Sequence, residues 1–276
     1  MSVPRGAALS STWLFVPGDR PERFAKAVAS GADQVIIDLE DAVAPKAKAR
    51  ARRAALHWLA AGGESWVRVN APGTPWYDED ISVLGSSAAL RGIVVPKSER
   101  ASDLVALAGR VAPGTELMAL IESARGVLSA AAIVDCEPVA RLAFGALDFA
   151  LDIDADDGDD ALLLARSTLV IASRAAGKPA PVDSVTTNLA PTAAASDARR
   201  ARALGFGGKL LIHPAQVAPA AEAFRPTDHE VEWARGVLDA ARETPNGAVG
   251  KDGHMLDRPV VERARRIIGR ASGQNA

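Results

Sequence analysis

Charged side chains in this sequence stand where short apolar runs end. One run ends on Asp38, the next on Arg68, and two later ones on Glu122 and Asp148. If each run is a buried strand of a parallel sheet, these residues follow the carboxyl ends of successive strands. In a parallel barrel those ends meet at one face, where active sites lie. The spacing therefore predicts one polar site assembled from several strands.

Glu122 and Asp148 would follow the fifth and sixth strands, which are neighbours in a barrel. Two carboxylates on neighbouring strand ends are able to share one hard cation. Mg²⁺ is typically held by one or two carboxylates, with waters and substrate oxygens completing its shell. Each residue could instead cap the helix that follows it or pair with a nearby arginine. Their spacing alone leaves both interpretations open.

A dense acidic cluster, Asp38, Glu40 and Asp41, follows the second strand. Three carboxylates this close repel one another unless a positive group lies among them, and Arg68, Lys97 or a metal-bound water would serve. Asp38 and Glu40 are catalytic candidates because such groups orient metal-bound water and cationic side chains. Arg68 in turn needs an anionic partner, which is either this cluster or a substrate carboxylate gripped by two hydrogen bonds.

Apolar runs alternate along the chain with alanine-rich, charged stretches. The runs predict strands at residues 13–16, 35–39, 66–69, 92–95, 117–121, 142–144, 181–185 and 209–212, and the stretches predict helices such as 21–30, 46–60, 99–111, 123–133 and 160–176. Eight strand–helix units favour an α/β fold of the TIM (β/α)8 barrel type. A doubly wound open sheet is less favoured, because the turn at 17–20 lacks the Gly-x-Gly-x-x-Gly spacing of dinucleotide-binding folds.

The pattern changes after Pro214. We assign residues 1–215 to a barrel catalytic domain and residues 216–276 to a C-terminal helical extension. Apolar residues at helical spacing predict helices at 230–243 and 259–270, with a glycine-rich stretch at 247–253 between them. Because eight units already complete a barrel, we expect this extension to pack on the barrel or on an adjacent subunit.

The composition restricts the classes of partner. With 48% hydrophobic residues, 24% charged residues and a net charge of −2, the chain has no general attraction to nucleic acid or to anionic lipid. The basic run 46–53 lacks interleaved aromatic residues and is interpreted as a solvated helix face. No run approaches a membrane span of about 20 apolar residues. The single cysteine, Cys136, fits a reducing compartment, so we expect a cytoplasmic protein with a small-molecule substrate.

Several motifs together resemble a known family. They begin with Leu14-Phe15-Val16-Pro17-Gly18 and Asp38-Leu39-Glu40-Asp41-Ala42-Val43, continue through Val95-Pro96-Lys97 and Ile212-His213-Pro214, and end with Gly253-His254-Met255-Leu256-Asp257. In this order they resemble the CitE-like (citrate lyase beta subunit-like) CoA-ester lyases of the HpcH/HpaI aldolase superfamily, a group that includes malyl-CoA and citramalyl-CoA lyases. The resemblance spans nearly the whole chain.

The resemblance implies Mg²⁺ as cofactor and an acyl-CoA substrate, in a homotrimer or homohexamer. By position, Glu122 and Asp148 match the metal ligands, and Arg68 matches the residue that grips the substrate's carboxylate or thioester end. Asp257 matches the acid/base aspartate that an adjacent subunit supplies from its C-terminal segment. The expected substrate-binding residues are Phe15, Arg20, Lys26, Asp41, Arg68, Glu122, Leu147, Ile212 and His213.

The implied reaction is reversible, Mg²⁺-dependent cleavage of a 3-hydroxyacyl-CoA to acetyl-CoA and a 2-oxo acid. Citramalyl-, malyl-, citryl- and hydroxymethylglutaryl-CoA types all stay open, because an acidic loop from Asp152 stands where the family usually has Leu-Gly. One alternative is a class II-type pyruvate aldolase on free 2-oxo acids, which would not need Arg20 and Lys26 for nucleotide phosphates. Another is a non-catalytic acyl-carrier-binding subunit of a citrate lyase-like complex.

Overall fold

The computed structural model describes residues 6–156, 158, 160–243 and 257–272. The chain divides into two compact units, Met1–Glu222 and Ala223–Ala276. Each unit has its own apolar interior. Among the described residues, no helix is both long and apolar enough to cross a membrane.

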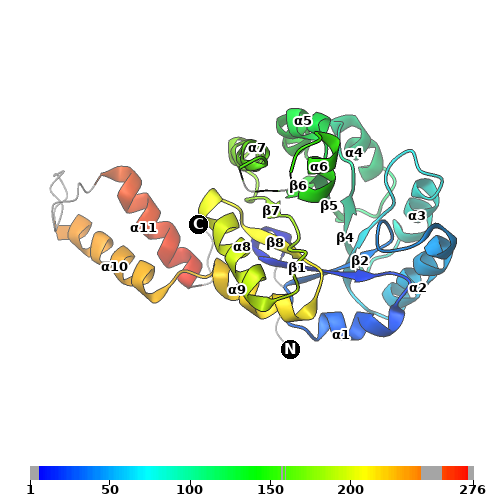
Figure 1. The fold of residues 1–276 in the computed structure, drawn as a ribbon, viewed down its shortest axis with the longest axis horizontal. Helices are drawn as coiled ribbons and strands as arrows, with labels where there is room; N and C mark the ends of the chain where they lie inside the picture. Colours follow the sequence, from blue (N-terminus) through cyan, green and yellow to red (C-terminus); the bar gives the residue numbers. More distant parts are fainter. Residues whose placement is uncertain (1–5, 157, 159, 244–256, 273–276) are drawn as a thin grey trace. The chain divides into compact units, whose positions relative to one another are not determined.

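The first unit is a barrel of parallel strands. Its strands are β1 Thr12–Pro17, β2 Gln34–Asp38, β3 Ser65–Arg68, β4 Leu90–Val95, β5 Glu116–Ile121, β6 Val139–Phe144, β7 Val182–Asp183 and β8 Gly208–Leu211. Successive strands pair in parallel and β1 also pairs with β8, so the described strands close into a barrel in sequence order (Figure 1). The predicted TIM-barrel fold is confirmed. Near-continuous apolar runs are what parallel strands need when helices cover the sheet.

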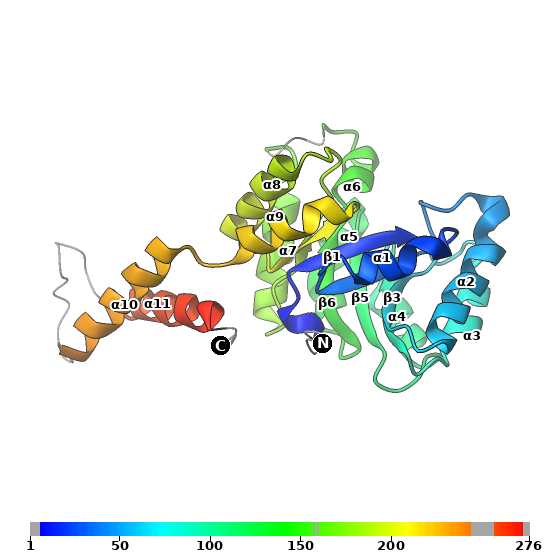
Figure 2. The ribbon, with the colours of Figure 1, turned by 90° about the horizontal axis from the view of Figure 1, so that it is seen from below.

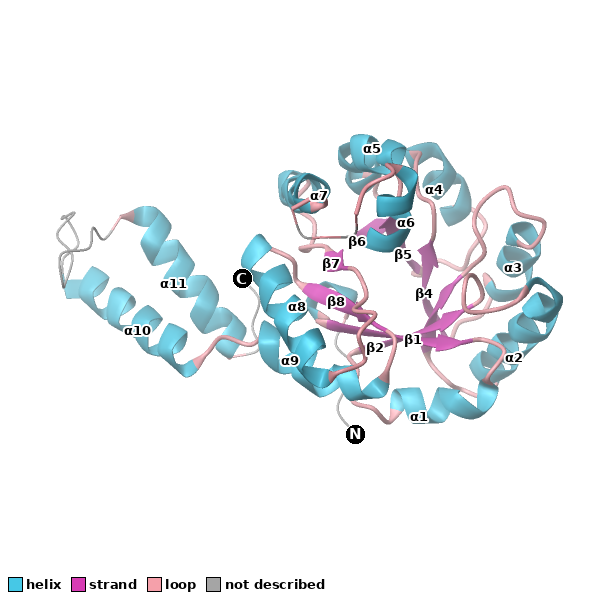
Figure 3. Cartoon of the chain, viewed as in Figure 1, coloured by secondary structure: helices cyan, strands magenta, loops and turns pink. Residues whose placement is uncertain are grey.

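Helices connect the strands around the outside of the barrel (Figure 3). They are α1 Phe24–Val28, α2 Lys48–Ala60, α3 Tyr77–Leu84, α4 Ala101–Ala108, α5 Ala124–Asp135, α6 Ala146–Asp152, α7 Leu163–Ala175, α8 Pro191–Leu204 and α9 Val217–Phe224. Short 3₁₀ helices occur at Ala7–Leu9, Pro21–Arg23, Pro45–Ala47 and Pro214–Gln216. Ser123 begins α5 as its N-cap, because its hydroxyl oxygen accepts a hydrogen bond from the Gly126 N–H at 3.1 Å.

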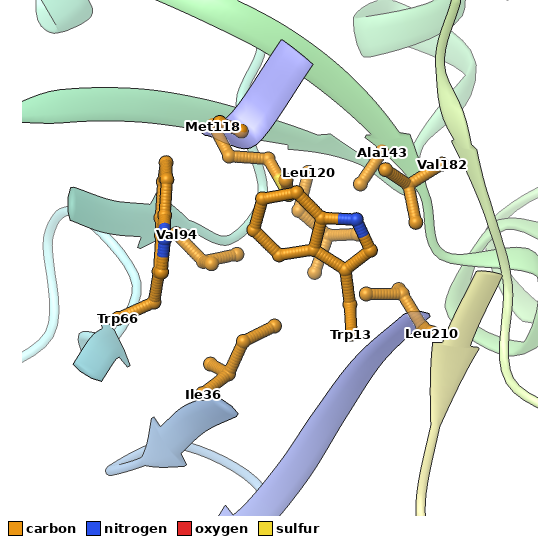
Figure 4. Packing of buried hydrophobic residues seen from close by; sticks show 10 residues of the cluster. Trp13, Ile36, Trp66, Val94, Met118, Leu120, Ala143, Val182 and Leu210 are labelled. Atoms are coloured by element: carbon orange, nitrogen blue, oxygen red, sulfur yellow. The ribbon is translucent and has the colours of Figure 1, made fainter. Parts of the chain in front are cut away.

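The barrel interior is filled by apolar side chains. Trp13, Trp66 and Met118 belong to this cluster and come from β1, β3 and β5 (Figure 4). The indole rings of Trp13 and Trp66 meet edge to face, with centroids 5.1 Å apart. Such pairs stabilise a core beyond the area that they bury. Gly92 makes room for them, because a Cβ at that position would collide with the Trp66 ring.

Arg141 connects chain segments at the amino-terminal end of the barrel through hydrogen bonds. Its Nη1 donates to the carbonyl oxygens of Ala7 at 2.8 Å and Ser10 at 2.7 Å. Its Nε donates to the carbonyl oxygen of Ala180 at 2.6 Å. Burial lowers the pKa of Arg141 to about 9. The bonded carbonyl groups precede β1 and β7, so Arg141 lies at the amino-terminal end of the barrel, opposite the strand ends that carry the predicted polar residues.

The second unit is a pair of helices, α10 Asp228–Glu243 and α11 Arg258–Ala271, which lie side by side in both views (Figure 1 and Figure 2). Their shared interior is formed by Ala234, Val237, Ala264 and Ile267. Both helices agree with the predicted ranges within the usual uncertainty of helix ends. The glycine-rich stretch 247–253 lies outside the described residues. That the extension packs on the barrel or on an adjacent subunit stays a prediction.

The basic run 46–53 is not a uniformly solvated helix face. Lys48 and Arg52 are only 6% and 2% exposed. Lys48 Nζ donates to two backbone carbonyl groups of the loop after β2, both at 2.7 Å, and Arg52 Nε pairs with Asp80 Oδ1 at 2.6 Å. The interpretation from sequence was wrong for these two residues. Side chains four positions apart share one face of a helix, and here that face is turned to the barrel.

Candidate active site

Arg68 and Asp38 form a fork-shaped ion pair at the carboxyl ends of β3 and β2. The two residues are register partners in the sheet. Arg68 Nε donates to Asp38 Oδ1 at 2.7 Å, and Arg68 Nη2 donates to Asp38 Oδ2 at 2.6 Å. Two parallel charge-assisted hydrogen bonds fix both the position and the orientation of the guanidinium group. In this structure the anionic partner of Arg68 is therefore the chain's own acidic cluster.

Two further carboxylates share the same guanidinium group. Arg68 Nη1 lies 3.0 Å from Glu40 Oε2 and 3.4 Å from Asp41 Oδ2. Arg68 Cζ lies 4.7 Å from the centre of the Phe15 ring, a cation–π contact. Burial favours the neutral form of Arg68, but the charges of Asp38, Glu40 and Asp41 outweigh it and raise its pKa above the ordinary value. Arg68 is a permanent positive charge among three acids.

Glu40 is a buried acid, and one of its carboxylate oxygens accepts no hydrogen bond. It is 8% exposed, and its Oε2 accepts no aligned hydrogen bond even though Arg68 Nη1 lies 3.0 Å away. Burial raises the pKa of Glu40 to about 8, and the charge of Arg68 opposes this rise without cancelling it. The backbone N–H of Glu40 donates to Asp38 Oδ1 at 2.9 Å, which holds the residue in place. Glu40 is suited to exchange a proton near neutral pH.

The raised pKa of Glu40 predicts a pH-dependent stability. Native Glu40 keeps its proton up to about pH 8, whereas the unfolded chain releases it near the ordinary value. Between these values the native state binds more protons, so the free energy of unfolding falls as pH rises. From roughly pH 5.5 to 7.5, the wild type should lose about 2–3 kcal/mol more than Glu40→Gln in urea unfolding without added metal. Equal slopes for the two proteins would show that Glu40 is not protonated in the fold.

Glu122 and Asp148 lie close enough to share one cation. Glu122 follows β5 and is 2% exposed, whereas Asp148 lies in the first turn of α6 with its side chain 38% exposed. Lys97 follows β4, and its Nζ lies 2.9 Å from Asp148 Oδ1 and 3.6 Å from Glu122 Oε1. The backbone N–H of Lys97 also donates to Glu122 Oε1, at 2.7 Å. The two predicted metal ligands thus meet around a single positive charge.

The position of Glu122 depends on a close approach of backbone at Gly145. Gly145 lies between β6 and α6 and packs against the Glu122 side chain, where an added Cβ would lie 2.5 Å from Oε2 and 2.7 Å from the Glu122 Cβ. Burial raises the pKa of Glu122 to about 7, and the charge of Lys97 opposes the rise. A carboxyl group with this pKa is available in its ionised form at neutral pH.

Gly145→Ala should destabilise the barrel by forcing Glu122 to move. Overpacking of this kind costs about 1–3 kcal/mol. The measurement is the free energy of unfolding in urea. Gly158→Ala is the matched control, because a Cβ there meets nothing within 4 Å. If both variants are as stable as the wild type, Glu122 does not depend on the missing side chain at position 145.

The structure places the other predicted substrate-binding residues at the surface of the first unit. Leu147, on α6, and Ile212, after β8, are 44% and 40% exposed. His213 is exposed, and its Nδ1 accepts a hydrogen bond from the Ala215 N–H at 3.2 Å, capping the 3₁₀ helix that follows. Arg20, after β1, and Lys26, on α1, are also exposed. Their part in substrate binding stays a prediction.

Asp257 lies in the second unit and is the N-cap of α11. Its exposed carboxylate accepts a hydrogen bond from the Val260 N–H at 3.1 Å. Aspartate is a favoured N-cap because it satisfies a helix N–H that has no partner within the helix. The rest of its motif, residues 253–256, lies outside the described residues. The acid/base role predicted for Asp257 stays a prediction.

The Arg68 group and the Glu122 group influence each other electrostatically. Burial is the main cause of the raised pKa values of Glu40 and Glu122. The negative charge of Glu122 raises the pKa of Glu40 further, and the positive charge of Arg68 lowers the pKa of Glu122. In the part of the chain that the structure describes, no three His, Cys, Asp or Glu side chains are grouped to hold a metal. The two carboxylates present suit a hard ion that completes its shell with water and substrate oxygens.

Two residues of this site escaped sequence reasoning. The sequence offers Lys97 only as a counter-ion for the acidic cluster after β2, whereas it pairs with Glu122 and Asp148. Its position two residues after the end of β4 was the available signal. Ser184 Oγ accepts a hydrogen bond from the Ala146 N–H at 3.0 Å and so holds the start of α6, which carries Asp148. Ser184 follows a strand of two residues and has no comparable signal.

A family profile described as HpcH/HpaI aldolase/citrate lyase matches residues 11–214. The chain belongs to this family. The resemblance found in the sequence motifs is thereby confirmed, and so is the expectation that the chain is a lyase.

Relatives in the HpcH/HpaI family align over almost the full chain. A citrate lyase subunit beta-like protein of Deinococcus radiodurans is 38% identical, with 95% of this chain and 97% of that protein covered. One of Mycobacterium tuberculosis is 37% identical, covering 94% of each chain. A (3S)-malyl-CoA thioesterase of Cereibacter sphaeroides is 32% identical, covering 94% and 93%.

Solved structures agree with these relatives. The protein CitE of M. tuberculosis, in complex with magnesium, acetoacetate and coenzyme A, superposes with a TM-score of 0.85 at 35% identity, covering 96% of this chain and 99% of that one. A citrate lyase beta subunit of M. tuberculosis with oxaloacetate and magnesium gives 0.71 at 36% identity, covering 79% and 99%. Together these similarities support an HpcH/HpaI enzyme of the CoA-ester lyase type.

Proposed function

We propose that the chain is a Mg²⁺-dependent lyase that cleaves a 3-hydroxyacyl-CoA reversibly to acetyl-CoA and a 2-oxo acid. Citramalyl-, malyl-, citryl- and hydroxymethylglutaryl-CoA types are the candidate substrates. The observation that carries the proposal is the pair of carboxylates, Glu122 and Asp148, gathered around one positive charge. The solved CitE complex that contains magnesium, acetoacetate and coenzyme A supports it.

The two carboxylates fit a magnesium ion. The position of the Lys97 ammonium group, 2.9 Å from Asp148 and 3.6 Å from Glu122, supports this fit, because one positive charge already lies near both acids. Glu122 and Asp148 would hold Mg²⁺. When bound, the ion would supply Lewis-acid polarisation of the substrate's hydroxyl or oxo oxygen.

Arg68 and Glu40 supply charge and proton transfer in this proposal. In the fraction of molecules in which Glu40 is ionised, its Oε2, the oxygen without an aligned hydrogen bond, accepts the hydroxyl proton of the substrate. The electrons of the breaking C–C bond form the thioester enolate, and the fixed guanidinium of Arg68 stabilises the developing negative charge. The ion pair with Asp38 keeps that guanidinium in place, so the charge needs no rearrangement during the reaction. A carboxyl of Asp257 then donates a proton to the enolate carbon, which completes acetyl-CoA.

Two substitutions separate the catalytic role of Asp257 from its role as a helix cap. Asparagine caps a helix about as well as aspartate, whereas alanine does not. We expect Asp257→Asn to keep the helix content and thermal stability of the wild type while acetyl-CoA release falls by about 10²–10⁴-fold. Asp257→Ala should show the same loss of activity with lower stability. Full activity in Asp257→Asn would reduce Asp257 to a structural cap.

The experiment that tests the proposal is acetyl-CoA release by the purified chain over a panel of 3-hydroxyacyl-CoA thioesters, with Mg²⁺ and with EDTA. Release that requires Mg²⁺ and is strongest for one thioester would support the lyase and identify its substrate. No release from any thioester, together with pyruvate formation from free 4-hydroxy-2-oxo acids, would favour the aldolase. Activity that appears only with added carrier proteins would favour a subunit of a larger complex.

We further propose that the chain works as a homotrimer or homohexamer in which Asp257 serves the site of an adjacent subunit. Glu122→Gln and Asp257→Asn would each inactivate such an assembly. A mixed assembly would contain sites with both intact residues, provided by different chains. Co-refolding or co-expression of the two variants should therefore restore part of the activity. No recovery in a mixture shown to contain mixed assemblies would place both residues in one subunit.

A further inference from the structure

Lys97 contacts the Glu122 and Asp148 pair in two separate ways. Its backbone lies in the left-handed region, with a φ of 50°, which a residue other than glycine rarely adopts. This backbone directs its N–H to Glu122 Oε1 at 2.7 Å. Its side chain reaches back between the acids, with Nζ 2.9 Å from Asp148 Oδ1 and 3.6 Å from Glu122 Oε1. The side chain is 41% exposed, so it has an open route to solvent.

The ammonium group stands where a divalent ion would have to bind. Mg²⁺ needs carboxylate oxygens at about 2.1 Å with near-octahedral geometry. Lys97 Nζ already occupies the side of Glu122 Oε1 and Asp148 Oδ1, while Glu122 Oε2 packs against the Gly145 backbone. A divalent ion and an ammonium group cannot both lie between the same two acids, because they repel each other and compete for the same oxygens. One has to leave when the other binds.

We propose that Lys97 is a built-in counter-cation that holds Glu122 and Asp148 together in the metal-free protein and is displaced when a divalent ion binds. This inference rests on the proposed metal site. The backbone N–H of Lys97 stays on Glu122 and keeps that carboxylate oriented, while the flexible side chain swings out to solvent. Lys97 is thus a positioning residue that competes with the metal, and its ammonium group lowers the affinity for the ion.

The test is Mg²⁺ binding by isothermal titration calorimetry, with the metal alone as ligand, at one fixed alkaline pH. Lys97→Met removes the charge and keeps the chain length. Lys97→Asn removes it and tolerates the left-handed backbone better. Lys46→Met is the matched control, because Lys46 is exposed and the substitution changes the net charge equally. We expect both Lys97 variants to bind Mg²⁺ about tenfold more tightly than wild type, a change of about 1.4 kcal/mol, with Lys46→Met unchanged.

Weaker or equal Mg²⁺ affinity in both Lys97 variants would overturn the inference, because a competing cation that is removed must leave the site easier to fill. If neither the wild type nor any variant binds the metal, the proposed metal site itself fails. The two failures are therefore distinguishable.

A second measurement uses the wild-type protein and needs no variant to fold. Amine labelling followed by peptide mass spectrometry should show faster modification of Lys97 when Mg²⁺ is added, with no change at Lys46. Equal labelling of Lys97 with and without bound Mg²⁺ would mean that the side chain is not displaced.

Discussion

Glu122→Gln is expected to abolish Mg²⁺ binding and to lower acetyl-CoA release by at least about a thousandfold, while the fold stays as stable as the wild type or becomes more stable. The amide has the shape of the carboxyl group but cannot supply the negative oxygen that Mg²⁺ prefers. Loss of the ion removes charge stabilisation worth several kcal/mol in the transition state. Burial raises the pKa of Glu122 to about 7, so the metal-free fold tolerates an uncharged side chain such as glutamine at this position.

Glu116→Gln is the matched control for this substitution. Glu116 lies on the same strand, β5, but at its amino end and only partly buried. The substitution Glu116→Gln should leave metal binding and activity unchanged. The measurements are calorimetric titration with Mg²⁺, the acetyl-CoA assay and urea unfolding without metal. If Glu122→Gln still binds Mg²⁺ and turns over, Glu122 is not a ligand and the proposed site is wrong.

Arg68→Met is expected to destabilise the protein by about 3–5 kcal/mol and to remove its activity. Breaking a buried ion pair costs this much because the partner charge is left uncompensated. The side chain of Arg68 is 11% exposed and that of Asp38 is 2% exposed, so water does not replace the lost guanidinium easily. Asp41 would lose the same counter-charge. The measurement is the free energy of unfolding in urea at neutral pH.

The double variant Arg68→Met/Asp38→Asn measures the interaction energy between Arg68 and Asp38. Removing the charge of Asp38 as well should recover part of the stability lost in Arg68→Met, giving a coupling energy in the range of about 0.5–3 kcal/mol for residues in contact. Arg68→Lys should be more stable than Arg68→Met but less stable than the wild type, because an ammonium group cannot make the two parallel hydrogen bonds. Additive effects of the two single substitutions would mean that the ion pair contributes nothing to stability.

The barrel was predictable because parallel strands under helices are buried on both faces. Gln34–Asp38 and Glu116–Ile121 contain near-continuous apolar runs, and a charge at the end of each marks the side where the strand leaves the core. The same rule placed Asp38, Arg68 and Glu122 at one end of the barrel. Sequence spacing was thus enough to bring these three residues to one end of the barrel, but it did not identify the roles of Lys97 and Ser184 there.

The pairing of those residues was beyond the sequence, because it depends on side-chain reach and local backbone. Lys97 joins Glu122 and Asp148 through a left-handed turn, and a lysine gives no signal of that conformation as a glycine would. Lys48 looked solvated, although its burial supports the loop that carries Glu40. The acid/base role of Asp257 came only from the family resemblance, because the structure gives its side chain the local contact of a helix N-cap.

The most direct test of the proposed site is a crystal structure of the chain grown with Mn²⁺ and pyruvate, with the anomalous signal of the metal measured. One anomalous peak is expected at about 2.0–2.2 Å from carboxylate oxygens of both Glu122 and Asp148. The pyruvate should lie beside it on the Arg68 side, and Lys97 Nζ should have moved away. A peak held by other residues, with Lys97 still bridging Glu122 and Asp148, would show that these two acids are not the metal ligands.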